Sequence, residues 1–133
     1  MRVRFPGGMR IEAEYRGFTI RTDQTEKAGG EGSAPSPFDL FLASLGTCTG
    51  YYVLAFCRKR DIPTDEIELT METVRNEESH MIERIDITVH LPESFPARYV
   101  SACLKSTEQC KVKRHLGEPP EIVLTAAHPS VPA

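Results

Sequence analysis

The sequence has no excess of basic charge, no Cys-x-x-Cys pair and no apolar leader. Its 16 lysines and arginines are scattered and outnumbered by 19 acidic residues, for a net charge of −3. We therefore expect no nucleic-acid partner. Residues 1–6 (MRVRFP) lack the apolar run of a secretory signal. We therefore expect a cytoplasmic protein, in which thiols stay reduced unless a disulfide belongs to a working cycle.

The four cysteines also lack the spacing of a metal site, and no histidine stands at a typical ligand interval. We expect neither a metal nor a cofactor. A chain of 133 residues has room for one domain, and such a domain buries about two-thirds of the surface that its unfolded chain exposes. That core needs no disulfide staples, so the cysteines are expected to serve catalysis or core packing.

The longest uncharged run covers Leu40–Cys57, 18 residues at the lower edge of a membrane-spanning length. Its serines, threonines and glycines argue against a span, and we expect no membrane. Apolar residues lie nearly all the way round, which predicts a helix buried on most faces. Gly46 and Gly50 permit a close approach to another element. A second copy of this helix in a two-fold homodimer is one candidate, and the chain's own sheet is the other.

Local signals define where this helix begins and ends. Ser36 can cap it, Pro37 suits the first helical position, and Asp39 completes a capping-box pattern. We predict that the helix runs to about Arg60, where a basic cluster suits a helix C-terminus.

The remaining elements follow from periodicity and turn residues. Alternating apolar and polar residues predict strands, and glycine-rich or polar stretches predict loops. The predicted elements are two strands within Met9–Thr22 that turn at Gly17, a loop over Asp23–Pro35, strands Asp65–Thr73 and Glu83–Leu91 joined by a turn over Arg75–His80, a helix from Phe95 to about Gln109, a strand over Glu121–Ala126 and a frayed tail from His128. The order ββ-α-ββ-α-β predicts one α+β domain over residues 1–133, with mostly antiparallel sheet.

Among the cysteines, Cys57 and Cys103 are expected to be small buried hydrophobic residues. Cys110 differs because the basic segment 111–115 (KVKRH) follows it, and positive charge favours a thiolate. By this local argument Cys110 is the more exposed thiol and Cys48, in the middle of the apolar helix, the more sheltered one. Cys48 and Cys110 form our candidate working pair.

The glycine-rich loop, the Ser36-Pro37 helix start, the segment 44–49 (SLGTCT) and Cys110 after a second helix resemble the OsmC/Ohr family. These are the osmotically inducible and organic-hydroperoxide-resistance proteins, and the resemblance runs from about Gly29 to Ala126. It implies an intertwined α+β homodimer with a long buried central helix and active sites at the subunit interface.

The resemblance also implies a thiol peroxidase cycle. Cys48 would attack an organic hydroperoxide as a thiolate and become a sulfenic acid. Cys110 would then condense with it to a disulfide, and an external dithiol reductant would restore both thiols. A non-catalytic redox sensor or small-ligand-binding dimer is the alternative, and a structural dimer with incidental thiols is a third reading.

The sequence departs from the family pattern in two places. Ten residues before Cys48, where the resemblance leads us to expect a glutamate paired with an arginine, the chain has Phe38. The neighbouring Asp39 is interpreted as part of the capping box. Arg16 is the candidate for the arginine, with Arg21 weaker. The second departure is Lys111, which follows Cys110 where many members have proline.

Overall fold

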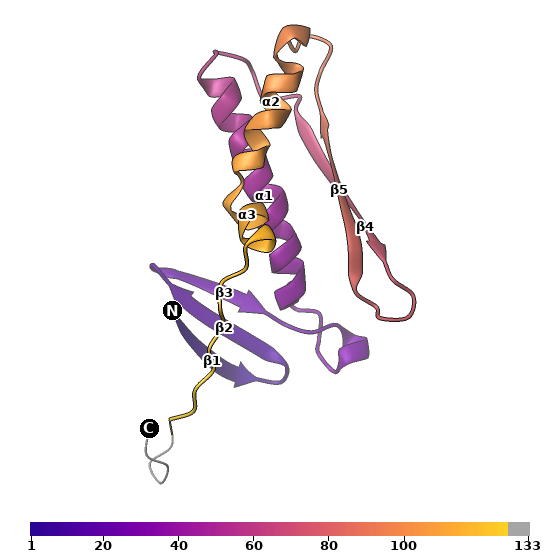
Figure 1. Ribbon diagram of the computed structural model, residues 1–133. Coiled ribbons are helices and arrows are strands. Elements are labelled where there is room, and N and C mark those ends of the chain that lie inside the picture. The colour runs from indigo at the N-terminus through magenta and orange to yellow at the C-terminus, as the bar shows by residue number, and fades with distance from the viewer. Residues whose placement is uncertain (128–133) are drawn as a thin grey trace.

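A computed structural model of the chain describes residues 1–127 as an α+β fold with two antiparallel sheets (Figure 1). The predicted tail from His128 lies outside the described residues. In chain order the elements are β1 (Arg2–Gly7), β2 (Arg10–Tyr15), β3 (Phe18–Thr22), the 3₁₀ turn η1 (Glu26–Ala28), α1 (Pro37–Arg58), β4 (Glu68–Arg75), β5 (Ile82–His90), η2 (Ala97–Tyr99), α2 (Val100–Ser106), η3 (Thr107–Gln109) and α3 (Lys111–Gly117).

The N-terminal sheet is an antiparallel meander in the order β1-β2-β3. Tyr15 pairs with Phe18, so β2 and β3 are joined by a two-residue turn. Both turn residues have positive φ, 51° at Arg16 and 82° at Gly17, as a type I′ hairpin requires. The predicted pair of strands is confirmed. The strand β1 was not predicted, and its Pro6 is tolerated because β1 is an edge strand.

This sheet packs against nothing substantial in its own chain. In Figure 1 it lies apart from α2 and from the β4–β5 hairpin, and among the described residues its strands contact chiefly one another. Val3, Phe5 and Phe18 remain exposed. Because small sheets depend on burying one apolar face, the single chain leaves this sheet incomplete.

The predicted loop between β3 and α1 is organised by Asp23, which is almost completely buried. Its carboxylate accepts hydrogen bonds from the backbone N–H groups of Gln24 (2.8 Å), Glu31 (3.2 Å) and Ser33 (3.0 Å), and from the Ser33 hydroxyl (2.7 Å). These bonds, those from Ser33 foremost, lower the pKa of Asp23 to about 2. Gly30 is required here, because a Cβ would lie 2.0 Å from the Gln24 carbonyl oxygen.

The start of α1 is confirmed. The Ser36 hydroxyl accepts from the Asp39 N–H (3.1 Å), and the Asp39 carboxylate accepts from the Ser36 N–H (2.8 Å), so both halves of the capping box form. The helix ends at Arg58, close to the predicted Arg60. By length and composition alone α1 could also cross a membrane, a criterion that core helices of soluble proteins meet as well.

The predicted burial of α1 on most faces is not found in the single chain. One stripe is buried: Leu45, Thr49, Val53, Phe56 and Cys57. Phe38, Tyr51 and Leu54 are exposed because α2, α3 and the β4–β5 hairpin leave part of the helix uncovered (Figure 1). Of the two glycines, Gly46 faces Met71 of β4, with 3.5 Å between a built Cβ and the methionine Cε. Gly50 faces open space.

The second sheet is the hairpin of β4 and β5, close to the predicted strands. Thr70 pairs with Thr88 near its centre. Its turn is built by Asn76, whose side-chain oxygen accepts from the N–H groups of Glu78 (2.9 Å) and Ser79 (2.8 Å). Such side-chain bonds are typical of an Asx turn.

The core lies between the C-terminal half of α1 and α2. Its buried members are Val53, Phe56, Cys57, Phe95 and Cys103. Val89 in β5 and Leu91, which follows that strand, pack against this cluster. The burial predicted for Cys57 and Cys103 is confirmed.

The C-terminal third differs from the prediction. The single helix to Gln109 is a short α2 with a 3₁₀ turn at each end, and an unpredicted helix, α3, follows Cys110. The strand predicted over residues 121–126 is absent. Its apolar residues Ile122, Val123 and Leu124 are 88%, 73% and 95% exposed. Alternation alone does not make a strand, because a strand needs a neighbour to pair with, and no described strand borders this segment.

Candidate active site

Cys48 lies in the middle of α1 and is half-buried. Its side chain lines a hollow of about 500 Å³ whose other walls are Ser44, Thr47, Tyr51, Tyr52 and Lys111. The rings of Tyr51 and Tyr52 meet edge to face, with 5.2 Å between their centroids. The hollow therefore combines two tyrosine rings, the two aliphatic hydroxyl side chains of Ser44 and Thr47, and one cation around a thiol.

Cys110 reaches the same place from the bend between η3 and α3. It is the N-cap of α3, and its sulfur accepts a hydrogen bond from the Lys113 N–H at 3.5 Å. Its thiol is also a hydrogen-bond donor to Cys48. The structure thus brings together the two cysteines that the sequence analysis paired, although they are far apart in the chain.

The predicted order of exposure is wrong for the single chain. Cys110 is completely buried, whereas Cys48 is partly exposed. The basic residues after Cys110 do not indicate that Cys110 itself is exposed, because they belong to α3 and most of that helix faces solvent. The chain bends at Cys110 (φ −52°, ψ 116°), and its side chain turns inward against α1.

The surroundings of Cys48 favour its thiolate. Burial by itself raises the pKa of this thiol. Hydrogen bonds from Cys110 and from the backbone N–H groups of Val112 and Lys111, together with the positive charge of Lys111, outweigh burial and lower the pKa below its ordinary value. Among the described residues, Lys111 is the one cationic side chain that lines this hollow.

The two arginine candidates lie elsewhere in the single chain. Arg16 occupies the β2–β3 turn, where its guanidinium carbon is 5.2 Å from the centroid of the Tyr15 ring. Arg21 is paired with Glu12 of the neighbouring strand, at 3.0 Å between Nε and the carboxylate oxygen. Neither lines the Cys48 hollow. An activating role for Arg16 therefore remains a prediction that requires a second chain.

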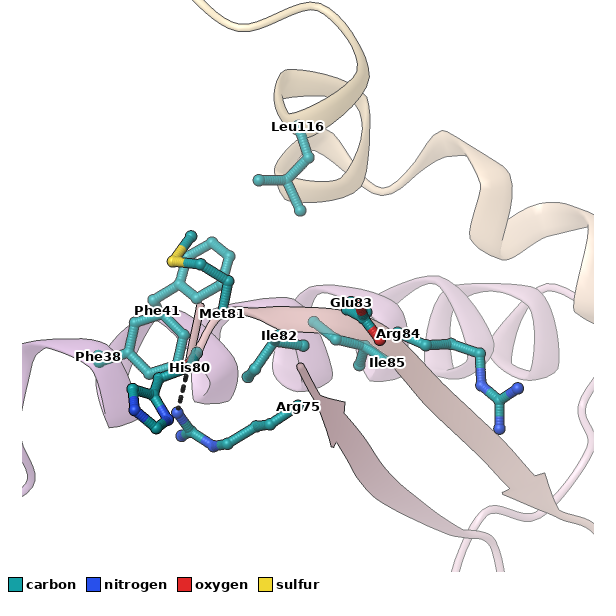
Figure 2. A pocket seen from close by; sticks show the side chains of 10 residues that line it. All are labelled: Phe38, Phe41, Arg75, His80, Met81, Ile82, Glu83, Arg84, Ile85 and Leu116. Atoms are coloured by element: carbon teal, nitrogen blue, oxygen red, sulfur yellow. Dashed lines mark hydrogen bonds between the residues drawn. The ribbon is translucent and has the colours of Figure 1, made fainter. Parts of the chain in front are cut away.

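Phe38 lines a separate, mainly apolar hollow of about 530 Å³ between the start of α1, the tip of the hairpin and α3 (Figure 2). Phe41, Met81, Ile82, Ile85 and Leu116 supply its other apolar walls. Arg75 lies at its edge and donates to the His80 carbonyl (3.2 Å). Asp39 is engaged in the capping box, so it does not take the place of the expected glutamate.

A second thiol pair lies in the core, which the sequence analysis did not foresee. Cys57 and Cys103 are completely buried and joined by a hydrogen bond. Burial raises the pKa of Cys103 to about 11, with a further contribution from the nearby Cys57, and burial raises that of Cys57 as well. These thiols are poor nucleophiles. Among residues 1–127 no cluster of three His, Cys, Asp or Glu side chains is placed to hold a metal ion.

A family model described as OsmC-like protein matches residues 30–125. The chain belongs to the OsmC-like family. The matched segment contains both thiols of the candidate site, the capping box of α1 and the β4–β5 hairpin. No curated protein sequence matches the chain.

Solved structures confirm an OsmC-like fold. One is a protein of Psychrobacter arcticus 273-4 whose name describes an osmotic stress induced and detoxification response. It is 20% identical, the match covers 85% of this chain and 84% of that one, and the TM-score is 0.72. A structural genomics target is 19% identical over 89% and 88% of the two chains, with a TM-score of 0.73.

A third structure is an organic hydroperoxide resistance protein OsmC of Legionella pneumophila, described also as a predicted redox protein. It is 15% identical over 85% and 90% of the two chains, with a TM-score of 0.48. The fold comparison rests on the first two structures.

Proposed function

We propose that this OsmC-like protein is a thiol peroxidase that reduces organic hydroperoxides in the cytoplasm. The main observation behind the proposal is that two thiols lie close together and differ in their exposure to solvent. Cys48 opens into a hollow with its pKa lowered, and Cys110 stands buried behind it within hydrogen-bonding reach. A nucleophile that a substrate can reach, backed by a second thiol, is the arrangement that a two-cysteine peroxidase needs.

In the first step the Cys48 thiolate attacks the terminal oxygen of the hydroperoxide. A sulfur–oxygen bond forms, the O–O bond breaks, and the leaving alkoxide takes up a proton to become an alcohol. Cys48 is oxidised to a sulfenic acid. The rings of Tyr51 and Tyr52 supply apolar surface for the organic part of the substrate, which favours an organic hydroperoxide over hydrogen peroxide.

In the second step the Cys110 thiol attacks the sulfenic sulfur, water leaves and a disulfide forms. Because Cys110 is buried, an external dithiol reaches the sulfur of Cys48 first. Cys110 is then the leaving thiolate, and the Lys113 N–H that contacts its sulfur stabilises that charge. The second thiol of the reductant then releases Cys48. The opposite order would apply if Cys110 were the more exposed thiol, as the sequence analysis predicted.

The working unit of the proposal is a homodimer. Two surfaces of the single chain are uncovered, the N-terminal sheet and the face of α1 that carries Tyr51 and Leu54. In addition, Arg16 does not line the Cys48 hollow of its own chain. These three observations support the dimer. A two-fold partner could cover these surfaces and bring its own Arg16 to the thiolate. Sedimentation velocity should then report a dimer, and a fully active monomer would contradict the proposal.

A complementation experiment tests the sharing of the site. Arg16→Gln and Cys48→Ser chains should each be inactive as homodimers. When they are unfolded together and refolded as a mixture, a mixed dimer contains one site with Cys48 from one chain and Arg16 from the other. Partial activity in the mixture supports a shared site, and a mixture as inactive as its components rules it out.

The peroxidase reaction is tested by stopped-flow oxidation of the reduced protein with cumene hydroperoxide and with hydrogen peroxide, followed by mass spectrometry. We expect a Cys48–Cys110 disulfide and a faster reaction with cumene hydroperoxide. Cys48→Ser should abolish the reaction, Cys110→Ser should leave a trappable sulfenic acid, and Cys103→Ser is the matched control. The proposal fails if neither Cys48 nor Cys110 reacts faster than free cysteine. Slow oxidation without turnover would favour the redox sensor.

A further inference from the structure

Lys111 contributes to the Cys48 hollow in two ways. It is the first residue of α3, and its backbone N–H is among the groups that lower the pKa of Cys48. Its side chain is exposed to solvent and lines the same hollow. Because Cys110 caps α3, the position that follows it is held against Cys48 by the same bend that buries Cys110.

No other cationic side chain of the described residues lines the Cys48 hollow besides Lys111. The titratable groups that line the hollow with Cys48 are Tyr51 and Tyr52 from α1 and Lys111 from α3, and Cys110 contacts the thiol from behind. Among them Lys111 alone is positively charged at neutral pH. The basic residues Arg114 and His115 line a different depression together with Glu118, and Lys111 borders that depression as well.

We propose that the Lys111 ammonium is the cation of its own chain that activates the Cys48 thiolate, a role that rests on the proposed peroxidase function but is tested without it. An ammonium near a sulfur stabilises the thiolate relative to the thiol. It therefore increases the fraction of Cys48 that can attack at neutral pH. The proton released by Cys48 goes to solvent, and Lys111 keeps its own.

The test measures the pH dependence of Cys48 alkylation by iodoacetamide in the full-length protein, read at this residue by peptide mass spectrometry. Lys111→Gln should move the midpoint to higher pH and slow alkylation near pH 7 by roughly three- to tenfold. Lys111→Arg should keep the midpoint of the unmodified protein. Lys105→Gln removes one exposed charge from α2 and should behave as the unmodified protein.

Salt provides a second measurement that needs no variant. Raising the ionic strength to about 1 M shortens the screening length to about 3 Å, so it should move the midpoint of the unmodified protein upward by more than that of Lys111→Gln. Coincident profiles for Lys111→Gln and the unmodified protein would overturn the proposal, as would a Lys111→Arg profile matching that of Lys111→Gln. Because alkylation needs no hydroperoxide, failure of the peroxidase reaction leaves this result intact.

Discussion

The two thiol pairs should differ sharply in reactivity toward an alkylating reagent under native conditions. The pKa of Cys103 is raised to about 11, so at pH 7 only about one molecule in 10⁴ carries its thiolate. The pKa of Cys48 lies below the ordinary 9.0, so its thiolate fraction exceeds about one in 100. Ionisation alone therefore predicts a rate ratio above about 100.

Access increases this ratio, because Cys48 is partly exposed and Cys103 is completely buried. The assay treats the reduced protein with iodoacetamide at pH 7 for increasing times, quenches, unfolds, and labels the remaining thiols with a heavier reagent. Mass spectrometry of the peptides then gives a rate for each cysteine. Cys48 should be labelled first, and Cys57 and Cys103 should become reactive only at the rate of unfolding.

Comparable rates for Cys48 and Cys103 in the folded protein would refute this reasoning, since they would mean that neither burial nor local hydrogen bonds separate the two pairs. The same measurement on Cys110→Ala tests the hydrogen bond between the working thiols. Removing a donor to the Cys48 sulfur should slow its labelling, and faster labelling would contradict the geometry.

Three further predictions concern the loop and helix start that position Cys48. Gly30→Ala should destabilise the protein by more than about 1 kcal/mol in urea unfolding, because the new Cβ would lie 2.0 Å from the Gln24 carbonyl oxygen; an unchanged midpoint would contradict this close approach. The lowered pKa of Asp23 means that its contribution to stability is complete above pH 3.8 and is lost as the pH falls through about 2. The urea midpoint of Asp23→Asn should therefore vary less over this window than that of the unmodified protein, and parallel curves would count against the hydrogen-bonded carboxylate. Ser36→Ala should cost about 1 kcal/mol in urea unfolding through loss of the cap to Asp39, whereas Ser33→Ala acts through the loop and should also raise the pKa of Asp23.

The elements that the sequence predicted well are those decided by neighbours in the chain. The capping box of Ser36 and Asp39 lies within one helical turn, the Arg16-Gly17 turn lies within one hairpin, and Asn76 builds its own turn. Such signals depend on bonds between residues a few positions apart, so a sequence read in short windows contains them. The glycine-rich loop was also recognisable, although the buried carboxylate at its centre was not.

The elements that the sequence predicted poorly depend on distant partners. The segment 121–126 alternates as a strand should but has no described strand beside it. The edge strand β1, by contrast, forms because β2 is there to pair with it. The start of α3 was hidden because its N-cap is a cysteine, an uncommon capping residue.

For the working pair, the sequence by itself determined that Cys48 lies within a long apolar helix and that a basic segment follows Cys110. Which thiol faces the hollow was decided by tertiary structure. The bend at Cys110 turns its sulfur toward α1 and leaves Cys48 as the accessible nucleophile. The exposure and the pKa of a thiol depend on all the atoms that pack around it. Here those atoms come from α1 and α3, which are far apart in the sequence and meet only in the folded chain.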